Sequence, residues 1–165
     1  MPATLRIAPC LWFDDRAEEA ARFYVGIFKN SKIREISHYS DAGHEVHGRP
    51  AGSVMAVSFE LNGQPFTALN GGPLFRFSEA ISFQISCETQ KEVDHYWSKL
   101  SAGGDPNAQQ CGWLKDKFGL SWQVVPTVLF QMLMDPEPAK SKRAMEAMLQ
   151  MKKLDIAKLK RAHAG

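Results

Sequence analysis

The sequence lacks several features that would place the chain in a specialised class of protein. No apolar run approaches the ~20 residues that a membrane-spanning helix needs. The first residues show no basic segment followed by an apolar stretch and a cleavage site, so we expect no secretory signal and a cytoplasmic protein. Only three cysteines are present, too widely spaced for a disulfide framework or a CxxC metal knuckle. We expect all three as reduced thiols that fill apolar space, with Cys10 buried.

The composition is that of an ordinary globular domain. Of the 165 residues, 44% are hydrophobic and 23% are charged. These values exclude a disordered, collagen-like or low-complexity chain. At about 100–200 residues per domain, the length predicts one domain or two small modules.

The net charge of +2 conceals a basic C-terminal segment. Residues 140–165 contain eight lysines and arginines against two acidic residues, a net charge of +6 that leaves −4 on residues 1–139. A basic segment of this kind can bind nucleic acid. No aromatic side chain is interleaved with these charges to stack on bases, so we interpret the segment as a solvated helix face and regard nucleic acid as an unlikely partner.

The first half of the chain predicts a strand, a helix and three further strands. Residues 5–13 carry apolar side chains on both alternating faces, which predicts a strand covered on both sides. Asp14 or Asp15 is a suitable N-cap for a helix over 16–28, where apolar residues recur at helical spacing. An Asn-Gly pair at 62–63 predicts a hairpin turn. The remaining strands are expected at 33–39, 53–60 and 64–70, with a polar loop over 40–52.

The order of elements then begins again. An alternating strand over 81–87 leads through an acidic residue into a helix over 90–101. Each half therefore has a strand end that feeds an acidic helix start, at Leu11-Trp-Phe-Asp14 and at Ile85-Ser-Cys-Glu88. We interpret this order as an internal duplication. A second hairpin is expected from 110–115 and 120–125, followed by helices with breaks near 135–138 and 152–153.

A strand, an acidic residue and a helix with Phe-Tyr are expected in the run Pro9-Cys-Leu-Trp-Phe-Asp-Asp-Arg-Ala-Glu-Glu-Ala-Ala-Arg-Phe-Tyr24. This run resembles the opening of the vicinal oxygen chelate superfamily, which includes the glyoxalases and the bleomycin-resistance proteins. Its PhnB-like branch has a hairpin that resembles Trp113-Leu-Lys-Asp-Lys-Phe-Gly-Leu-Ser-Trp-Gln-Val-Val-Pro126. Many members of that branch carry the name 3-demethylubiquinone-9 3-methyltransferase.

The resemblance implies an α+β fold of two βαβββ modules, which form a curved mixed sheet around a cavity. The modules are expected at about 5–73 and 80–126, together forming one domain over 1–126. A helical extension would then occupy 127–165. The resemblance also implies a homodimer, which would cover open sheet edges, and a small-molecule ligand.

Metal-dependent members of the superfamily hold their ion with one ligand from the first strand and one from the last strand of each module. By this resemblance, the corresponding positions are Ala8 (or Ile7), Ser82, Gln123 and one residue of Thr67–Asn70. None of these is His, Asp, Glu or Cys, and neutral oxygen donors bind a divalent transition metal poorly. We therefore expect no metal and no cofactor.

Uncharged polar and aromatic residues are the candidates for ligand binding. Ser82 and Gln84 alternate with apolar residues, so they point into a cavity or, in the simpler alternative, into solvent. A neutral amide such as that of Gln123 would hold a carbonyl, phosphate or amide group by hydrogen bonds. Large aromatic strand residues either pack in the core or stack on a ligand. The predicted ligand-binding residues are Cys10, Trp12, Asn70, Ser82, Gln84, Trp113 and Gln123.

Three histidines lie within ten residues, at His38, His44 and His47. A spacing of three would bring two imidazoles together on a helix, but the neighbouring glycines and proline favour a loop. In one interpretation the histidines are solvated loop residues, and in the other they lie over the mouth of the cavity. Arg49, in the same segment, would then be placed to bind an anionic substrate.

These observations favour a small-molecule-binding protein of the glyoxalase and bleomycin-resistance type, without a complete set of metal ligands. The alternative is an enzyme, such as a lyase, isomerase, dioxygenase or transferase, that acts on a small oxygenated metabolite. The methyltransferase name implies S-adenosylmethionine, whose usual binding turn is a glycine-rich loop between a parallel strand and a helix. Neither glycine pair, at 71–72 or at 103–104, has that context, so we find no support in the sequence for methyl transfer.

Overall fold

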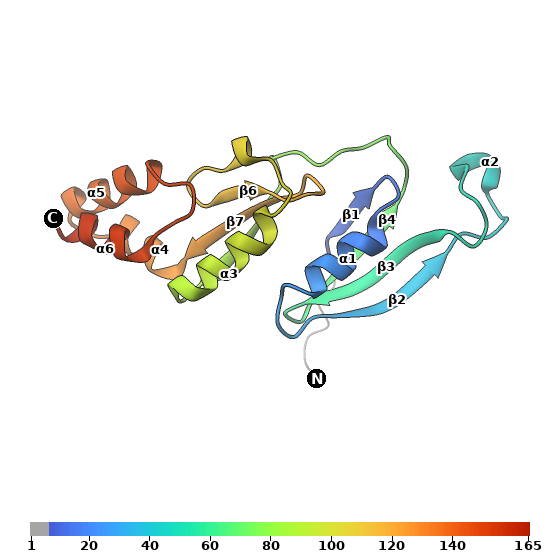
Figure 1. Ribbon diagram of the computed structural model, residues 1–165, viewed down its shortest axis with the longest axis horizontal. Helices are drawn as coiled ribbons and strands as arrows, with labels where there is room; N and C mark the ends of the chain where they lie inside the picture. Colours follow the sequence, from blue (N-terminus) through green and yellow to red (C-terminus); the bar gives the residue numbers. More distant parts are fainter. Residues whose placement is uncertain (1–6) are drawn as a thin grey trace. The chain divides into compact units, whose positions relative to one another are not determined.

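The computed structural model describes residues 7–165, which divide into two compact units (Figure 1). The N-terminal unit ends at Arg76, and the C-terminal unit runs from Phe77 to Gly165. Each unit combines a small sheet of mixed strand direction with helices, which confirms the predicted α+β class. Within the described residues, no helix has the length and apolar character that crossing a bilayer requires.

The N-terminal sheet consists of β1 (Cys10–Phe13), β2 (Lys32–His38), β3 (Val54–Leu61) and β4 (Gln64–Asn70). Its strand order is β1-β4-β3-β2, with β1 parallel to β4 and the other neighbours antiparallel. The first strand is shorter than the predicted 5–13, of which residues 5 and 6 lie outside the described part of the chain. The predicted hairpin turn is confirmed, because Asn62 and Gly63 have the φ angles of 48° and 82° that a type I′ turn requires.

One face of this sheet packs against helix α1 (Ala17–Val25). Alternate residues of β3, among them Val57 and Phe59, point to this side and are buried. Tyr24 of the helix stacks on Phe59 with ring centroids 6.4 Å apart. Small side chains on the helix, including Ala20, allow this close approach. The sheet therefore has one face covered by α1 and one open face.

The start of α1 differs from the prediction. Its N-cap residue is Arg16, whose side chain makes no capping bond. The Oδ1 atom of Asn70, at the end of β4, accepts the N–H of Ala17 at 2.8 Å instead. Asn70 can do so because the parallel pairing of β1 with β4 ends with Phe13 opposite Asn70, next to the helix start. The expected cap by Asp14 or Asp15 is wrong.

The segment predicted as a loop over 40–52 contains one helical turn, α2 (His44–His47). Gly43 and Gly48 flank this turn with φ angles of 80° and 63°, a left-handed conformation that glycine adopts without strain. The turn places the rings of His44 and His47 6.0 Å apart. The glycines thus end a short helix on both sides, where the sequence pattern indicated only a loop.

The C-terminal sheet consists of β5 (Phe83–Cys87), β6 (Trp113–Lys115) and β7 (Ser121–Pro126). Its order is β5-β7-β6, with β5 parallel to β7 and β6 antiparallel to it. Helix α3 (Gln90–Ser101) has the predicted bounds and begins with a capping box between Thr89 and Glu92. A short 3-10 helix, η1 (Pro106–Ala108), follows α3, where the resemblance implies a further strand.

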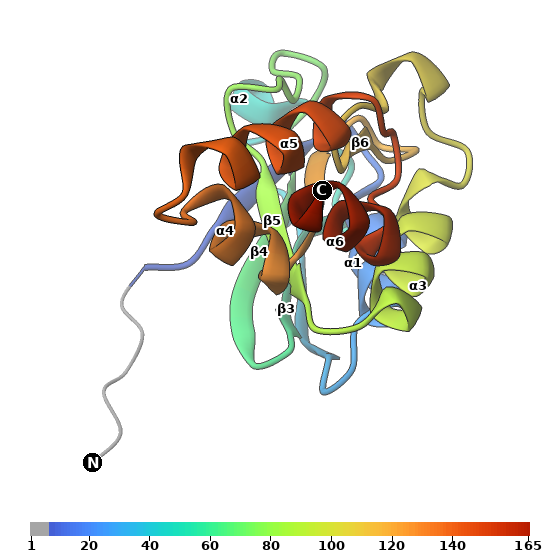
Figure 2. The same ribbon diagram turned by 90° about the vertical axis from the view of Figure 1, so that its left-hand side faces the viewer.

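Three helices complete the C-terminal unit: α4 (Thr127–Leu133), α5 (Pro138–Leu149) and α6 (Ile156–Ala164). Figure 1 shows them gathered at one end of this unit, the end that faces the viewer in Figure 2. Gln90 of α3 holds them in place, because its side chain donates to the carbonyl of Leu154 and accepts the N–H of Ile156. The basic C-terminal segment therefore packs within the C-terminal unit of the same chain. Their shared core with β7 consists of Val125, Leu129, Met132, Ala144, Leu154 and Leu159.

Candidate functional site

Two glutamines and a tryptophan form a row across the C-terminal sheet. The strand register pairs Gln84 of β5 with Gln123 of β7, and Gln123 with Trp113 of β6. Residues paired directly across neighbouring strands share a face of the sheet. We call these three residues the glutamine–tryptophan row.

Ser82 fixes the central member of this row. The Nε2 atom of Gln123 donates a hydrogen bond to Ser82 Oγ at 2.9 Å. Gln123 and Trp113 are half-buried, and Gln84 is exposed. Within residues 7–165, the side chains of Gln84 and Trp113 have no hydrogen-bond partner. The structure thus brings four of the predicted site residues together and leaves most of their polar groups available to a ligand.

The opposite face of the same sheet is apolar and covered. The next register row consists of Phe83, Trp122 and Leu114. Trp122 and Leu114 are buried, and Phe83 lies against Trp122 with ring centroids 5.5 Å apart. Helix α3 packs on this sheet through buried apolar side chains. Because successive strand residues point to opposite faces, this core turns the glutamine–tryptophan row to the other face. We call this the open face because Gln84 is exposed on it; Ser121 and Val125, on either side of Gln123, are buried.

A buried carboxylate sets that register. Asp116, in the turn between β6 and β7, is only 2% exposed. Its Oδ1 atom accepts the backbone N–H groups of Phe118 and Leu120 at 2.8 and 3.1 Å. Its Oδ2 atom accepts the indole N–H of Trp122 at 2.8 Å. Asp116 therefore holds Trp122 in the core and, through the alternation of β7, Gln123 on the open face.

In the N-terminal unit, the predicted residues Cys10 and Trp12 lie on the open face of β1. Cys10 is exposed, so the expectation of a buried residue is wrong. The reason is that α1 covers the side of Leu11 and Phe13, while the alternate side of the strand stays open. Desolvation still raises the pKa of the Cys10 thiol, so this sulfur is not an activated nucleophile. Cys87, by contrast, is buried, and burial raises the pKa of its thiol to about 12.

Trp12 is held by the glycine pair that follows β4. Its indole N–H donates to the carbonyl of Gly72 at 2.8 Å. Its ring meets Phe75 edge-on, with centroids 5.0 Å apart. A Cβ atom on Gly71 would lie 2.2 Å from the Trp12 ring, well inside van der Waals contact. The glycine at position 71 is therefore required by the position of Trp12.

Replacing Gly71 with alanine should displace the Trp12 ring and break its bond to Gly72. We expect a loss of about 2–3 kcal/mol in the free energy of unfolding, as for other overpacked sites. Urea unfolding gives the stability, and near-UV circular dichroism reports the tryptophan environment. Gly26→Ala is the matched control, because a Cβ there meets ordinary 3.5 Å contacts at a helical backbone position. Equal stabilities of the two variants would contradict this account of Gly71.

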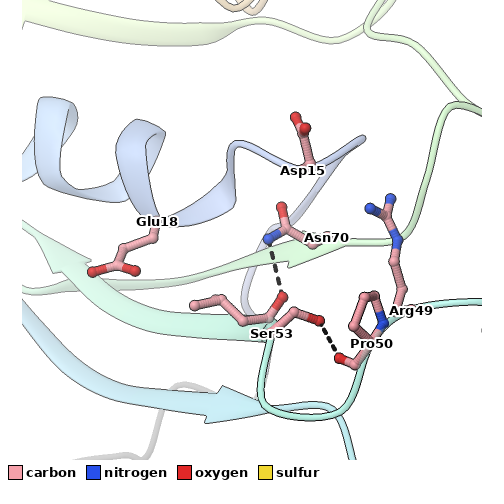
Figure 3. A pocket seen from close by; sticks show the side chains of 7 residues that line it. Asp15, Glu18, Arg49, Pro50, Ser53 and Asn70 are labelled. Atoms are coloured by element: carbon pink, nitrogen blue, oxygen red, sulfur yellow. Dashed lines mark hydrogen bonds between the residues drawn. The ribbon is translucent and has the colours of Figure 1, made fainter.

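A separate opening of about 230 Å³ lies within the N-terminal unit (Figure 3). Figure 3 shows Asn70 between the start of α1 and the segment that carries Arg49. Asn70 is predicted to bind ligand, but both ends of its amide are occupied, by the N–H of Ala17 and by the carbonyl of Val54 at 3.1 Å. Its side chain is therefore a structural part of the wall. The lining residues are Asp15, Glu18, Arg49, Pro50, Ser53, Val54 and Asn70.

Most residues of this opening were not predicted as site residues. The signal that would have found them is the parallel pairing of β1 with β4, which brings the end of β4 to the acidic start of α1. Arg49 was considered as an anion-binding residue. Its guanidinium donates to the backbone carbonyl of Asp14 and lies 3.0 Å from the carboxylate of the same residue. This ion pair offsets the charge that an anion would need.

The histidines have structural or exposed positions. The ring of His47 lies 4.4 Å from that of Tyr39. Its Nδ1 atom accepts the N–H of Arg49 at 2.9 Å, and its Nε2 atom faces a backbone carbonyl at 3.2 Å. Both ring nitrogens of His47 therefore face backbone groups. His38 and His44 are exposed, so the turn brings two imidazoles near each other without forming a ligand pair.

Comparison with known proteins identifies the family of this chain. The family model described as 3-demethylubiquinone-9 3-methyltransferase matches residues 5–125. The PhnB protein of Bacillus cereus is 35% identical, and its structure matches over 74% of this chain and 99% of that one with a TM-score of 0.62. The chain belongs to this family. No curated protein matches it.

More distant structures share the fold of the family. Protein PA1353 from Pseudomonas aeruginosa is 19% identical and covers 74% of this chain and 98% of its own, with a TM-score of 0.57. The fosfomycin resistance protein FosX from Listeria monocytogenes, in complex with Mn(II) and a sulfate ion, is 17% identical. It covers 81% of this chain and 97% of its own, with a TM-score of 0.52. These likenesses show the superfamily fold, and the family match ends before α4, α5 and α6.

The donors at the superfamily's metal positions do not fit a divalent metal ion. Ser82 and Gln123 are neutral and bonded to each other. The side-chain amide of Asn70 is bonded to the backbone of Ala17 and Val54, and the side chain of Ala8 has no atom that could bind a metal. Over residues 7–165, no three His, Cys, Asp or Glu side chains gather closely enough to hold a metal. Neutral oxygen donors offset little of a divalent charge, so we derive no chemical step through a metal.

The methyl donor implied by the family's description does not fit this chain either. S-adenosylmethionine is usually bound at a glycine-rich turn from a parallel strand into a helix. Within residues 7–165, three parallel strands lead into helices: β1 through Asp14–Arg16 into α1, β5 through Glu88–Thr89 into α3, and β7 directly into α4. None of these connections contains glycine. We derive no methyl-transfer step for this member of the family.

Proposed function

We propose that this protein binds a neutral small molecule on the open face of its C-terminal sheet, without using a divalent metal. The observation that carries this proposal is the glutamine–tryptophan row, in which uncharged polar groups, most of them without a partner among residues 7–165, lie beside an aromatic ring. Binding sites for small molecules combine such apolar surface with a few placed polar groups. Membership in a superfamily that includes resistance proteins supports the same function.

The row supports binding better than it supports proton transfer. Glutamine and tryptophan side chains do not titrate near neutral pH, and the Ser82 hydroxyl is held by a neutral amide. General acid–base catalysis needs a group whose pKa lies near the working pH. The predicted homodimer, the cytoplasmic location and the ligand-binding roles of Cys10 and Trp12 rest on the resemblance and the sequence, and they stay predictions.

Metal analysis tests the metal-independent part of this proposal. We expect purified protein to contain no stoichiometric metal by plasma mass spectrometry. We also expect Zn²⁺, Mn²⁺, Fe²⁺, Ni²⁺ and Mg²⁺ to leave its melting temperature unchanged. A metal present at 100 times its Kd would add about 2.7 kcal/mol, a shift of several degrees for a chain of this size. Stoichiometric metal together with such a shift would overturn the metal-free site.

A fragment screen tests the binding itself. Neutral organic fragments should shift backbone and side-chain signals of β5, β6 and β7 in ¹H–¹⁵N spectra, equally with and without EDTA. Gln123→Ala should weaken those shifts, because it removes the central amide of the row. Gln131→Ala, which changes an exposed glutamine on α4, should leave them unchanged. A screen in which no neutral fragment binds this face would refute the proposed function.

A further inference from the structure

We infer that the ligand of this face is a planar, neutral molecule with a hydrogen-bond donor and an acceptor side by side on one edge. Lactams, imides and ring carboxamides have such an edge. This inference rests on the proposed function and narrows it to a chemical class. Its basis is the state of each polar atom in the glutamine–tryptophan row.

The first step concerns the amide of Gln123. One of its two N–H groups is committed to Ser82 Oγ at 2.9 Å. This bond leaves Oε1 and the second N–H of Gln123 for a ligand. A carboxamide that presents an acceptor next to a donor is complementary to a molecule with a donor next to an acceptor. Protein amides recognise the edge of adenine by the same pairing.

The second step concerns Gln84. This residue lies directly opposite Gln123 on the parallel strand, and its amide has no protein partner within residues 7–165. Two carboxamides on neighbouring strands therefore offer donors and acceptors on the same face of the sheet. Neither carries a charge. A charged ligand would lose its hydration on this face without an opposite charge to replace it.

A lysine of β6 shares this face, and its charge is already paired. Lys115 pairs with Ser121 in the register and so shares the face of Gln123. Its ammonium forms an ion pair with Glu79. The hydrogen bond from Lys115 lowers the pKa of the Glu79 carboxyl, so this pair is intact at neutral pH. It supplies no free cation that would select an anionic ligand.

The third step concerns Trp113, on the other side of Gln123. Two other tryptophans contact protein groups. Trp122 is bonded to Asp116 and packs on Phe83. Trp12 is bonded to Gly72 and packs on Phe75. Trp113 is half-buried and makes no ring contact or side-chain hydrogen bond with the described residues. An indole beside two amides suits a flat ring that stacks on it while its polar edge meets the glutamines. The flat ring that suits Trp113 and the donor–acceptor edge that suits the glutamines together define the class of ligand.

Two matched probes test this inference on the full chain. The lactam 2-quinolone has the N–H donor beside the carbonyl acceptor, and 1-methyl-2-quinolone keeps the ring and the carbonyl but lacks the donor. We expect 2-quinolone to bind about tenfold more tightly, the effect of one hydrogen bond to a partly buried acceptor. Titrations followed by ¹H–¹⁵N spectra should show shifts in the side-chain amides of Gln84 and Gln123 and in the indole of Trp113.

Variants then assign the preference to the row. Gln84→Ala removes an exposed side chain without partners, so the fold is retained and the preference for 2-quinolone should fall. Ser82→Ala should reduce it too, because Gln123 loses its fixed orientation. Trp113→Leu should weaken both probes alike, and Gln131→Ala should change neither. A well-dispersed ¹H–¹⁵N spectrum of each variant, like that of the unmodified protein, shows that the variant is folded.

The outcomes separate this inference from the proposed function. If other neutral fragments bind the face but both quinolones bind equally, the edge recognition is wrong and the proposed function stands. If 2-quinolone binds elsewhere, with no shift in Gln84, Gln123 or Trp113, the inference is wrong as well. If no fragment of any kind binds this face, the proposed function fails and the inference fails with it.

Discussion

Replacing Asp116 with alanine is expected to lower the free energy of unfolding by about 3–5 kcal/mol, a large part of the stability of a typical domain. The carboxylate is 2% exposed and accepts three N–H groups, from Phe118, Leu120 and the indole of Trp122. Alanine would leave all three donors without their partner in the turn. Each unsatisfied buried donor costs about 1–3 kcal/mol. Urea unfolding followed by tryptophan fluorescence measures the loss.

Two further variants sharpen this prediction. Asp105→Ala is the matched control, since Asp105 is exposed and its carboxylate accepts one N–H, from Asn107 at 2.8 Å. It should cost about 1 kcal/mol, as the loss of a cap does. Asp116→Asn should fall between the two, because an amide can keep the backbone bonds but places its NH₂ group against the indole N–H. A loss for Asp116→Ala no larger than that for Asp105→Ala would show that the carboxylate does not hold the turn.

The second large effect is expected for Asn70→Ala, at about 2–4 kcal/mol of unfolding free energy. The Asn70 amide accepts the first N–H of α1 from Ala17 and donates to the carbonyl of Val54. It is 6% exposed, so water replaces neither bond easily. Because α1 has no side-chain cap from its own N-cap residue, the variant should also loosen the helix start. Urea unfolding and amide hydrogen exchange in the first turn of α1 measure both effects.

Asn107→Ala provides the comparison, because Asn107 is exposed and its side chain makes no hydrogen bond within residues 7–165. It should change the stability by less than about 0.5 kcal/mol. Asn70→Asp keeps the acceptor for Ala17 but sets an oxygen against the Val54 carbonyl, so it should also be destabilising. Normal stability of both Asn70 variants would mean that this residue is not structural, and its predicted role in ligand binding would regain support.

The sequence pattern was most informative where local chemistry decides the structure. The capping box at Thr89 and Glu92 begins α3 at the predicted residue, and the Asn-Gly pair turns the hairpin between β3 and β4. The sequence pattern gave a wrong prediction where the hydrogen-bond partner of a residue lies on a distant strand. The cap of α1 comes from Asn70, 53 residues further along the chain than Ala17, and local pattern cannot reveal such a partner.

The candidate site shows the same division. Alternation along the predicted strand 81–87 places Ser82 and Gln84 on one face, and the resemblance singles out Gln123. Trp113 is a candidate because it is a large aromatic residue on a predicted strand. The alternation left open whether that face meets solvent or a ligand, and it could not show that these residues form one row. The prediction that Cys10 is buried is wrong. A strand with two apolar faces predicts that both faces are covered, whereas α1 covers only one face.

The sequence by itself determined the fold class, most of the helices and strands, and the family of this protein, because periodicity, turn residues and caps act over a few neighbouring residues. Tertiary structure alone decided which side chains meet. The β5-β7-β6 order and its register bring Gln84, Gln123 and Trp113 into line from three separate segments. The buried Asp116 carboxylate holds that register, Asn70 of β4 ties down the start of α1, and Gln90 of α3 ties down the start of α6. Such contacts depend on the pairing of strands far apart in the chain, which no local pattern specifies.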